Sequence, residues 1–338
     1  MSVFRRIVTT GKYLPEVDGL RFLAIASVVL YHFQGFHPQP GLTEVSAHGY
    51  RGVNLFYVIS GFILGLPFAA HHLDGKPTVS LRSYFIRRLT RLEVPYLLNL
   101  LICFALLVLA YHRDAAELWP HLFASMLYLH NLVYGEQSSI NPVAWTLEVE
   151  VQFYCLAPAL ASVFKIRDIT ARRALLIAAI VAISAVQLYF WDAPPRLRLS
   201  LVWAIQFFLT GLLLADVYLT SKPEVSESSW LWDLVAAVNV PLILLPTDRP
   251  LWFALPFLLL ATAYSAFHGT IFRSLLRSPF IATTGGMCYS IYLIHYILIP
   301  VIPNPAVYVA VMLAVSAAYF LVVERPCMVR DWPRKLFH

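Results

Sequence analysis

Eleven long apolar runs follow one another along the chain, and short polar segments separate them. Each run is close to the roughly 20 residues that a helix needs to cross about 30 Å of hydrocarbon. The pattern therefore predicts an all-α fold, a polytopic membrane helical bundle. The runs lie near residues 19–37, 51–70, 92–111, 118–134, 143–164, 174–191, 200–219, 230–246, 250–267, 281–302 and 305–323.

The distribution of positive charge indicates which run does not cross. Cytoplasmic loops of membrane proteins carry an excess of Lys and Arg. If 118–134 crossed, the basic segment 165–173 would lie on the side opposite the basic N-terminus. We therefore predict about ten transmembrane helices, with 118–134 on the surface or re-entrant. Both termini are then cytoplasmic, in a plasma membrane or a bacterial inner membrane.

The composition supports an integral membrane protein and leaves no length for a separate soluble domain. Hydrophobic residues make up 59% of the chain, and charged residues 13%, against about 25% in ordinary globular sequences. The mean hydropathy of +0.68 agrees. Residues 1–338 are predicted to form a single membrane domain, with membrane lipid as its surroundings.

Charge and cysteine usage argue against two other classes. The net charge of +6 is spread between apolar runs and forms no basic stripe, so no nucleic acid is expected as a partner. The four cysteines show no CxxC pair and no Cys/His spacing of the metal-site type. No disulfide framework and no metal are predicted.

Ionisable residues inside the apolar runs are the first candidates for a site, because hydrocarbon tolerates them only toward a bundle interior or a wet cavity. Asp18, Arg21 and His32 follow the helical spacing of one face in the first run. At 1.5 Å per residue, His32 is placed roughly 20 Å above the inner end of its helix. A lone histidine there either holds two helices together by a hydrogen bond or takes part in chemistry.

Two later runs carry further ionisable residues at similar depth. Glu150 lies in the run 143–164, which crosses in the opposite direction, and is expected at the height of His32. Glu148 points to nearly the opposite side of that helix, so it either pairs structurally or faces an outer cavity. His295 is also near mid-depth, and packing is its preferred interpretation because the spacing identifies no partner.

Two arginines near the predicted cytoplasmic end of the third span suggest anion binding. Arg88 and Arg91 are three residues apart, so their guanidinium groups share a helix face and could hold a phosphate in bidentate fashion. Arginines at such a position also commonly anchor a helix to lipid headgroups. Spacing alone leaves both interpretations open.

Familiar nucleophile and nucleotide motifs are absent from the sequence. It has no G-x-S-x-G elbow, no P-loop and no H-E-x-x-H pattern. Ser60 precedes Gly61 in an apolar run, and a Ser-Gly pair in a membrane helix is more often a packing notch than a nucleophile.

Taken together, five segments in order resemble the acyltransferase-3 family of membrane O-acyltransferases over nearly the whole chain. One departure is Asn54, where the family commonly has Asp. No SGNH-type hydrolase segment follows, so the membrane unit alone is expected. The five segments are Leu14 to Arg21 with the later His32, Gly52 to Phe62, Arg88-Leu89-Thr90-Arg91, Trp145 to Tyr154, and Tyr289 to His295.

The resemblance implies transfer of an acyl group, usually acetyl from acetyl-CoA, to a hydroxyl of a carbohydrate, glycolipid or related acceptor. By the same resemblance, His32 would be the catalytic base and Arg88 with Arg91 the acyl-CoA contact. The remaining candidates are Glu150 as catalytic partner, Arg87 and Arg21 at the cofactor, and Asp18, Asn54, Trp145, Tyr154 and His295 in support.

A direct transfer fits these residues. A neutral imidazole, with an ordinary pKa near 6.5, suits general-base work at neutral pH, and Glu150 or another polar neighbour would orient it. The alternative is a transporter or flippase of an anionic or lipid-linked substrate, in which His and Glu relay protons. A third interpretation is a non-catalytic lipid-binding protein whose polar core only sets helix packing.

Overall fold

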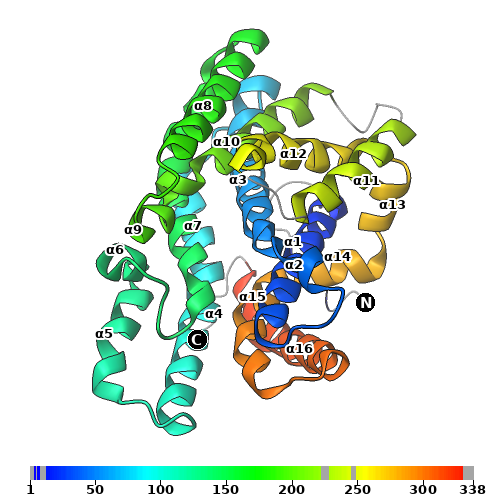
Figure 1. Cartoon of the computed structure of the whole chain (residues 1–338). Helices are drawn as coiled ribbons and strands as arrows, with labels where there is room; N and C mark the ends of the chain where they lie inside the picture. The colour runs from blue at the N-terminus through cyan, green and yellow to red at the C-terminus, as the bar shows by residue number, and fades with distance from the viewer. Residues whose placement is uncertain (1–3, 5, 8–12, 222–227, 245–248, 330–338) are drawn as a thin grey trace.

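The computed structural model describes residues 4, 6–7, 13–221, 228–244 and 249–329, and within these ranges the chain forms helices and no strand (Figure 1). The all-α prediction is confirmed. The long helices are α1 (Pro15–Phe36), α3 (Gly52–Asp74), α4 (Leu81–Leu109), α7 (Trp145–Leu160), α8 (Ile169–Tyr189), α10 (Leu201–Ser221), α12 (Arg249–His268) and α16 (Pro305–Tyr319).

Shorter helices connect and extend these. They are α2 (Thr43–Ser46), α5 (Ala115–Met126), α6 (His130–Tyr134), α9 (Pro195–Arg198), α11 (Trp230–Leu244), α13 (Ile271–Leu276), α14 (Pro279–Gly286), α15 (Cys288–Leu298) and α17 (Arg325–Cys327). The 3-10 turns are η2 (Gly49–Arg51), η3 (Pro142–Ala144), η4 (Ala161–Lys165) and η5 (Ile299–Val301), and η6 (Phe320–Glu324) is a π-helical turn.

Eight helical stretches of the described chain are long and apolar enough to cross a membrane. The bent pair α14 and α15 can supply a ninth span, and α11 is a shorter apolar helix of 15 residues. These ten elements coincide with the ten runs predicted to cross, so the polytopic bundle is confirmed, with eight spans or up to nine by length and composition within the described residues. The orientation of the termini stays a prediction.

The run 118–134 is broken into two pieces. Helix α5 has 12 residues and α6 has five, so α5 is roughly 18 Å long and too short to cross about 30 Å of hydrocarbon. Tyr128, between them, has a positive φ of 56°. The α5 helix packs beside α4, where the Tyr96 hydroxyl donates to the Ser125 carbonyl at 2.9 Å. A non-crossing segment at this place agrees with the prediction.

The centre of the bundle is the tight packing of α3 against α10. A Cβ at Gly61 would lie 2.2 Å from the Phe208 carbonyl oxygen, and one at Gly211 would lie 2.2 Å from that of Val58. Small residues allow membrane helices this close approach, because their association depends on van der Waals contact. The two glycines therefore fix the position of the α3 face that carries Ser60 and Tyr57.

We expect Gly211→Ala to lower stability by about 1–3 kcal/mol, because the added methyl group overpacks the contact with Val58. The measurement is the thermal unfolding midpoint of the purified protein in detergent. Gly35→Ala, in α1, is the matched control, since no atom lies within 4 Å of a Cβ there. Equal midpoints for the two variants would contradict the packing argument.

A bend of 74° separates α14 from α15. It lies at Met287, after two glycines, and the first of them lets α14 meet the α1 backbone: a Cβ at Gly285 would lie 1.7 Å from the Asp18 carbonyl oxygen. The change of direction brings the first turn of α15, with Cys288 and Tyr289, to the side of α1 and α4. A cavity lined by arginines forms at this place.

Candidate functional site

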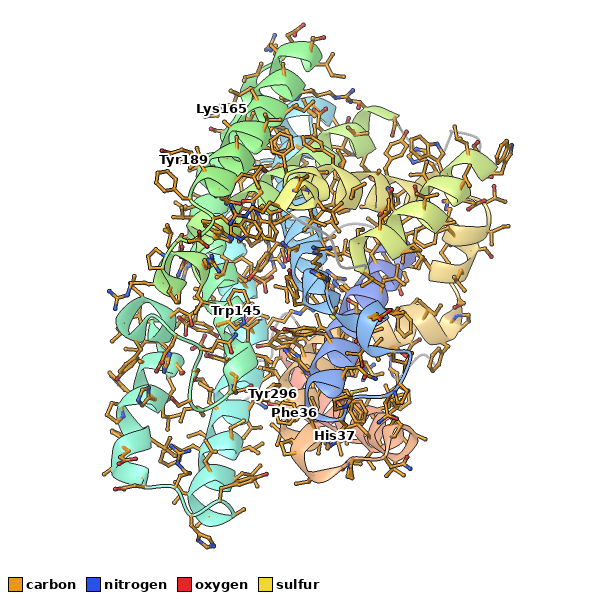
Figure 2. All side chains as sticks on the ribbon, in the orientation of Figure 1. Phe36, His37, Trp145, Lys165, Tyr189 and Tyr296 are labelled. Carbon is orange, nitrogen blue, oxygen red and sulfur yellow. The ribbon has the colours of Figure 1, made fainter. Side chains whose placement is uncertain are left out.

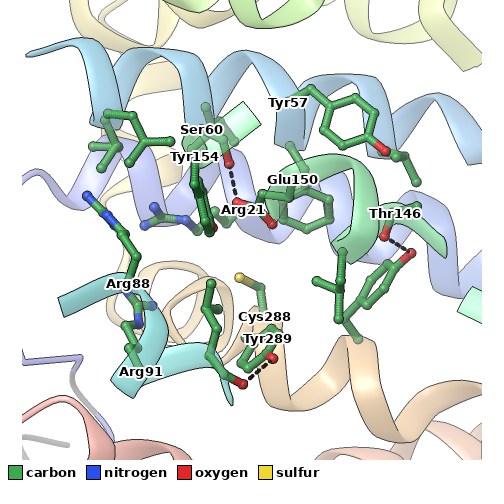
Figure 3. Close-up of a pocket in the computed structure, with 18 residues that line it drawn as sticks. Arg21, Tyr57, Ser60, Arg88, Arg91, Thr146, Glu150, Tyr154, Cys288 and Tyr289 are labelled. Atoms are coloured by element: carbon green, nitrogen blue, oxygen red, sulfur yellow. Dashed lines mark hydrogen bonds between the residues drawn. The ribbon is translucent and has the colours of Figure 1, made fainter. Parts of the chain in front are cut away.

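A cavity of about 110 Å³ lies between α1, α3, α4, α7 and α15 (Figure 3). Figure 3 shows Arg88 and Arg91 of α4 at one end and Thr146 of α7 at the other, with Glu150 between them. Tyr292 of α15 lies beside Thr146. The Tyr292 hydroxyl donates to the Val143 carbonyl at 2.9 Å and lies 2.7 Å from the Thr146 hydroxyl. The cavity thus runs from a cationic end to an aromatic one.

The cationic end holds more arginines than carboxylates. Arg21 Nη1 lies 2.5 Å from Asp18 Oδ1, and Arg6 approaches the same carboxylate at 3.6 Å. Arg91 is 3.9 Å from Glu324. Arg88 forms no ion pair with a carboxylate of the described residues and lies 6.0 Å from the centre of the Tyr84 ring. Of the four arginines, three therefore share two carboxylates at ion-pair distance, those of Asp18 and Glu324.

Unused donors at this end suit a phosphate-bearing ligand such as an acyl-CoA. The Nε atoms of Arg6 and Arg91 are buried and have no hydrogen-bond partner among the described residues. Buried donors are normally satisfied, and leaving one unpaired costs roughly 1–3 kcal/mol. An anion bound between these guanidinium groups would recover that free energy. The side chains present therefore fit the phosphate groups of the donor that the sequence analysis expects.

Glu150 lies midway along the cavity and pairs with Ser60. The Ser60 hydroxyl donates to Glu150 Oε1 at 2.7 Å, and Tyr154 lines the same cavity one turn further along α7 (Figure 3). The structure gives Glu150 a partner on α3, and His32 has a different polar neighbour, which is the alternative that the sequence left open. The interpretation of Ser60 as part of a packing notch did not predict this hydrogen bond.

His32 instead pairs with His295. His32 Nδ1 lies 2.9 Å from His295 Nε2, and the two rings stack at 5.1 Å between centroids. His295 Nδ1 lies 2.8 Å from the Tyr292 carbonyl oxygen, which can only accept. In the neutral pair, His295 therefore donates to that carbonyl and accepts from His32 Nδ1. This arrangement leaves a lone pair on His32 Nε2, the atom that could accept a proton.

The histidine pair lies beyond the aromatic end of the cavity. His295 is fully buried and stands one helical turn after Tyr292, which lines that end. His32 and Arg21 are eleven residues apart on α1, a rise of roughly 16 Å. His32 itself is not among the residues that line the cavity, so a bound molecule must extend past Tyr292 to reach it.

The remaining candidates are divided among other places. Asn54 and Trp145 line a second cavity, which is described below. Arg87 lines neither cavity. Glu148 is fully buried, and its Oε2 accepts from the backbone N–H of Asn131 at 2.8 Å, which matches the structural alternative proposed for it.

Sequence reasoning missed Glu324 and Arg6. Glu324 accepts hydrogen bonds from the backbone and the hydroxyl of Ser290, at 3.1 and 2.6 Å, and lies in the π-helical turn η6. The last apolar run ends at residue 323, one residue before Glu324. Treating every ionisable residue at the edge of an apolar run as a candidate site residue would have identified Glu324. Arg6 carries no local signal, because it lies outside the apolar runs and meets Asp18 only after folding.

Fold and site together define a class: a polytopic helical membrane protein with an arginine-lined internal cavity and a buried histidine pair. The chain belongs to the acyltransferase-3 family, whose model, described as an acyltransferase domain, matches residues 14–323. This agrees with the resemblance drawn from the five sequence segments.

Relatives of known name give a second comparison. The chain is 26% identical over 325 residues to O-acetyltransferase OatA of Staphylococcus aureus, in strains NCTC 8325 / PS 47 and COL. The match covers 87% of this chain and 52% of OatA, so the chain spans about half the length of these relatives. A provisionally named O-acetyltransferase of strain COL is 28% identical over 158 residues, which cover 44% of this chain and 25% of that protein. No solved structure matches the chain.

Proposed function

We propose that this chain is a membrane O-acyltransferase that moves an acyl group, acetyl by default, from acyl-CoA to a hydroxyl of a carbohydrate or related acceptor. The family membership and the O-acetyltransferase name of the relatives support the reaction class. The observation that carries the proposal is the cavity itself, which joins Arg88 and Arg91 to Tyr292, one helical turn before the histidine pair.

The arginines would hold the phosphates of the donor at the cationic end. Guanidinium groups suit this work because they stay charged and offer several donors in one plane. Arg21 would stay partly neutralised by Asp18, whereas Arg88 has no carboxylate of the described residues at ion-pair distance. On the positive-inside rule this end faces the cytoplasm, where acyl-CoA is available. The bound donor supplies a thioester carbonyl as the acyl source.

His32 would act as general base toward the acceptor. Its Nε2 lone pair takes the proton of the acceptor hydroxyl while the hydroxyl oxygen bonds to the acyl carbon and the carbon–sulfur bond breaks. The same nitrogen then returns the proton to the CoA sulfur, so the ring ends neutral. His295 holds the ring in the required tautomer and stabilises the transient positive charge, as a carboxylate does in catalytic triads.

The test is a transfer assay in membranes. Membranes that contain the chain are incubated with labelled acetyl-CoA, and label is followed into extracted glycans and lipid-linked sugars. We expect ester-linked label that mild alkali releases. Label no higher than in membranes lacking the chain would defeat the proposal. Uptake of intact substrate into sealed vesicles without new ester would favour the transporter interpretation.

A direct transfer predicts a small effect for Ser60→Ala. The loss of one hydrogen bond to Glu150 is worth about 0.5–1.5 kcal/mol, so we expect the transfer rate to fall about 2- to 13-fold. A covalent acyl-serine mechanism would instead lose nearly all activity. The transfer rate of the variant decides between the two, and label retained on denatured wild-type protein but not on the variant would contradict direct transfer.

A further inference from the structure

A second cavity, of about 270 Å³, lies on the other side of α3. Trp145 of α7, Trp203 of α10 and Trp252 of α12 contribute to its wall, together with Trp191 from the segment between α8 and α9. Trp252 meets Trp191 edge to face at 6.2 Å between ring centroids. Half of the eight tryptophans of the chain therefore border one space.

Polar groups in the same wall lack partners. Asn54 is only 7% exposed, and its side-chain amide makes no hydrogen bond with the described residues. One turn along α3, Tyr57 is 5% exposed, and its hydroxyl is also buried without a partner. A buried hydroxyl is normally paired, so the Tyr57 hydroxyl, with the Asn54 amide beside it in the wall, points to a hydrogen-bonding occupant. Arg198 adds a cation 6.0 Å from the Trp203 ring.

We infer that this second cavity binds a sugar ring of the acceptor, an inference that rests on the proposed O-acyltransfer. A pyranose has C–H faces that pack on flat aromatic rings and a rim of hydroxyls that exchange hydrogen bonds with an amide and a phenol. A lipid acyl chain would fill the space but leave Asn54 and Tyr57 unpaired. The volume is close to the lower end of small-molecule pockets, roughly 300 Å³, which suits one ring.

The second cavity borders both parts of the proposed reaction site. Val53 and Tyr57 line it and also line the arginine cavity, so they form a wall common to the two. Tyr50, at its edge, contacts the Tyr31 ring at 5.5 Å, and Tyr31 in turn lies 5.2 Å from the ring of His32. A sugar bound among the tryptophans is thus next to the donor cavity and two ring contacts away from the proposed base. This position suits a sugar unit of the acceptor.

The test separates acceptor binding from donor binding. Asn54→Ala and Trp203→Ala change residues that line only the second cavity. Transfer of label from acetyl-CoA is measured against increasing amounts of the glycan fraction extracted from the host. We expect the half-saturating glycan concentration to rise about 2- to 13-fold for Asn54→Ala and about tenfold for Trp203→Ala. The half-saturating acetyl-CoA concentration should stay unchanged.

Matched controls are Trp230→Ala and Tyr189→Phe, at residues that are 72% and 84% exposed and line neither cavity. Figure 2 shows Tyr189 at the outer edge of the bundle. Unchanged glycan saturation in both cavity variants, with wild-type transfer intact, would overturn this inference and leave the proposed function standing. If the wild type transfers no label, the proposed function falls. The inference about the second cavity is then decided by titrating purified protein with the same glycan fraction and following tryptophan fluorescence. Quenching that needs a higher glycan concentration in Asn54→Ala than in the wild type supports the inference. No quenching of the wild type overturns it.

Discussion

Replacing His32 by alanine is expected to lower the rate of acyl transfer by about 10²- to 10⁴-fold while the protein remains folded. A positioned general base contributes a factor of this size, and the variant removes the Nε2 lone pair that the pairing with His295 leaves available. The rate is measured with labelled acetyl-CoA in membranes, and the thermal unfolding midpoint reports folding. His72→Ala, at an exposed position at the end of α3, is the control.

The role of His295 can be separated from that of His32. His295→Gln keeps an acceptor for His32 Nδ1–H, whereas His295→Ala removes it. We expect the glutamine variant to retain more activity than the alanine variant, as a positioning residue should. Full activity of His32→Ala would end the assignment of the base, and equal activity of the two His295 variants would end the positioning role.

Replacing Arg88 or Arg91 by alanine is expected to weaken acyl-CoA binding about 13- to 150-fold. A hydrogen bond between charged partners is worth roughly 1.5–3 kcal/mol, and these two side chains share the cationic end of the cavity. The Kd is measured by titrating purified protein with acetyl-CoA. Arg88→Lys should recover only part of the loss, because lysine keeps the charge but not the planar pair of donors.

Arg82→Ala is the control for this experiment, since Arg82 is exposed in the first turn of the same helix. Comparable weakening in the control would indicate a general loss of positive charge. Binding that stays at the wild-type level in both Arg88→Ala and Arg91→Ala would remove the donor site from this end of the cavity.

Much of the architecture is predictable because hydrocarbon imposes a length and a composition on each crossing element. The breaks between apolar runs coincide with the breaks between helices, and the charge balance correctly separated 118–134 from the spans. The bend before Cys288 was not predicted, because a Gly-Gly pair inside a membrane run does not by itself break a helix, and this turn accompanies the packing of α14 on α1. A long apolar run therefore indicates that a membrane helix exists and how long it is, but says little about where the helix bends.

Pairing within the site was harder to predict. Equal depth suggested that Glu150 and His32 meet, but depth leaves the rotation of each helix about its axis undetermined. That rotation follows from contacts such as Gly61 on Phe208, which set which face of α3 reaches Glu150. His295 was assigned to packing for the same reason, since 263 residues separate it from its partner and no local spacing links them.

The wall shared by the two cavities has a consequence for the bilayer itself. A chain that admitted a water-filled passage from one membrane face to the other would leak protons and ions and dissipate the electrochemical gradient of its cell. Val53 and Tyr57 border both cavities, so this pair of side chains lies between the two spaces. A continuous passage through the chain at this place would have to open between these two side chains, which makes them part of the barrier against such a leak.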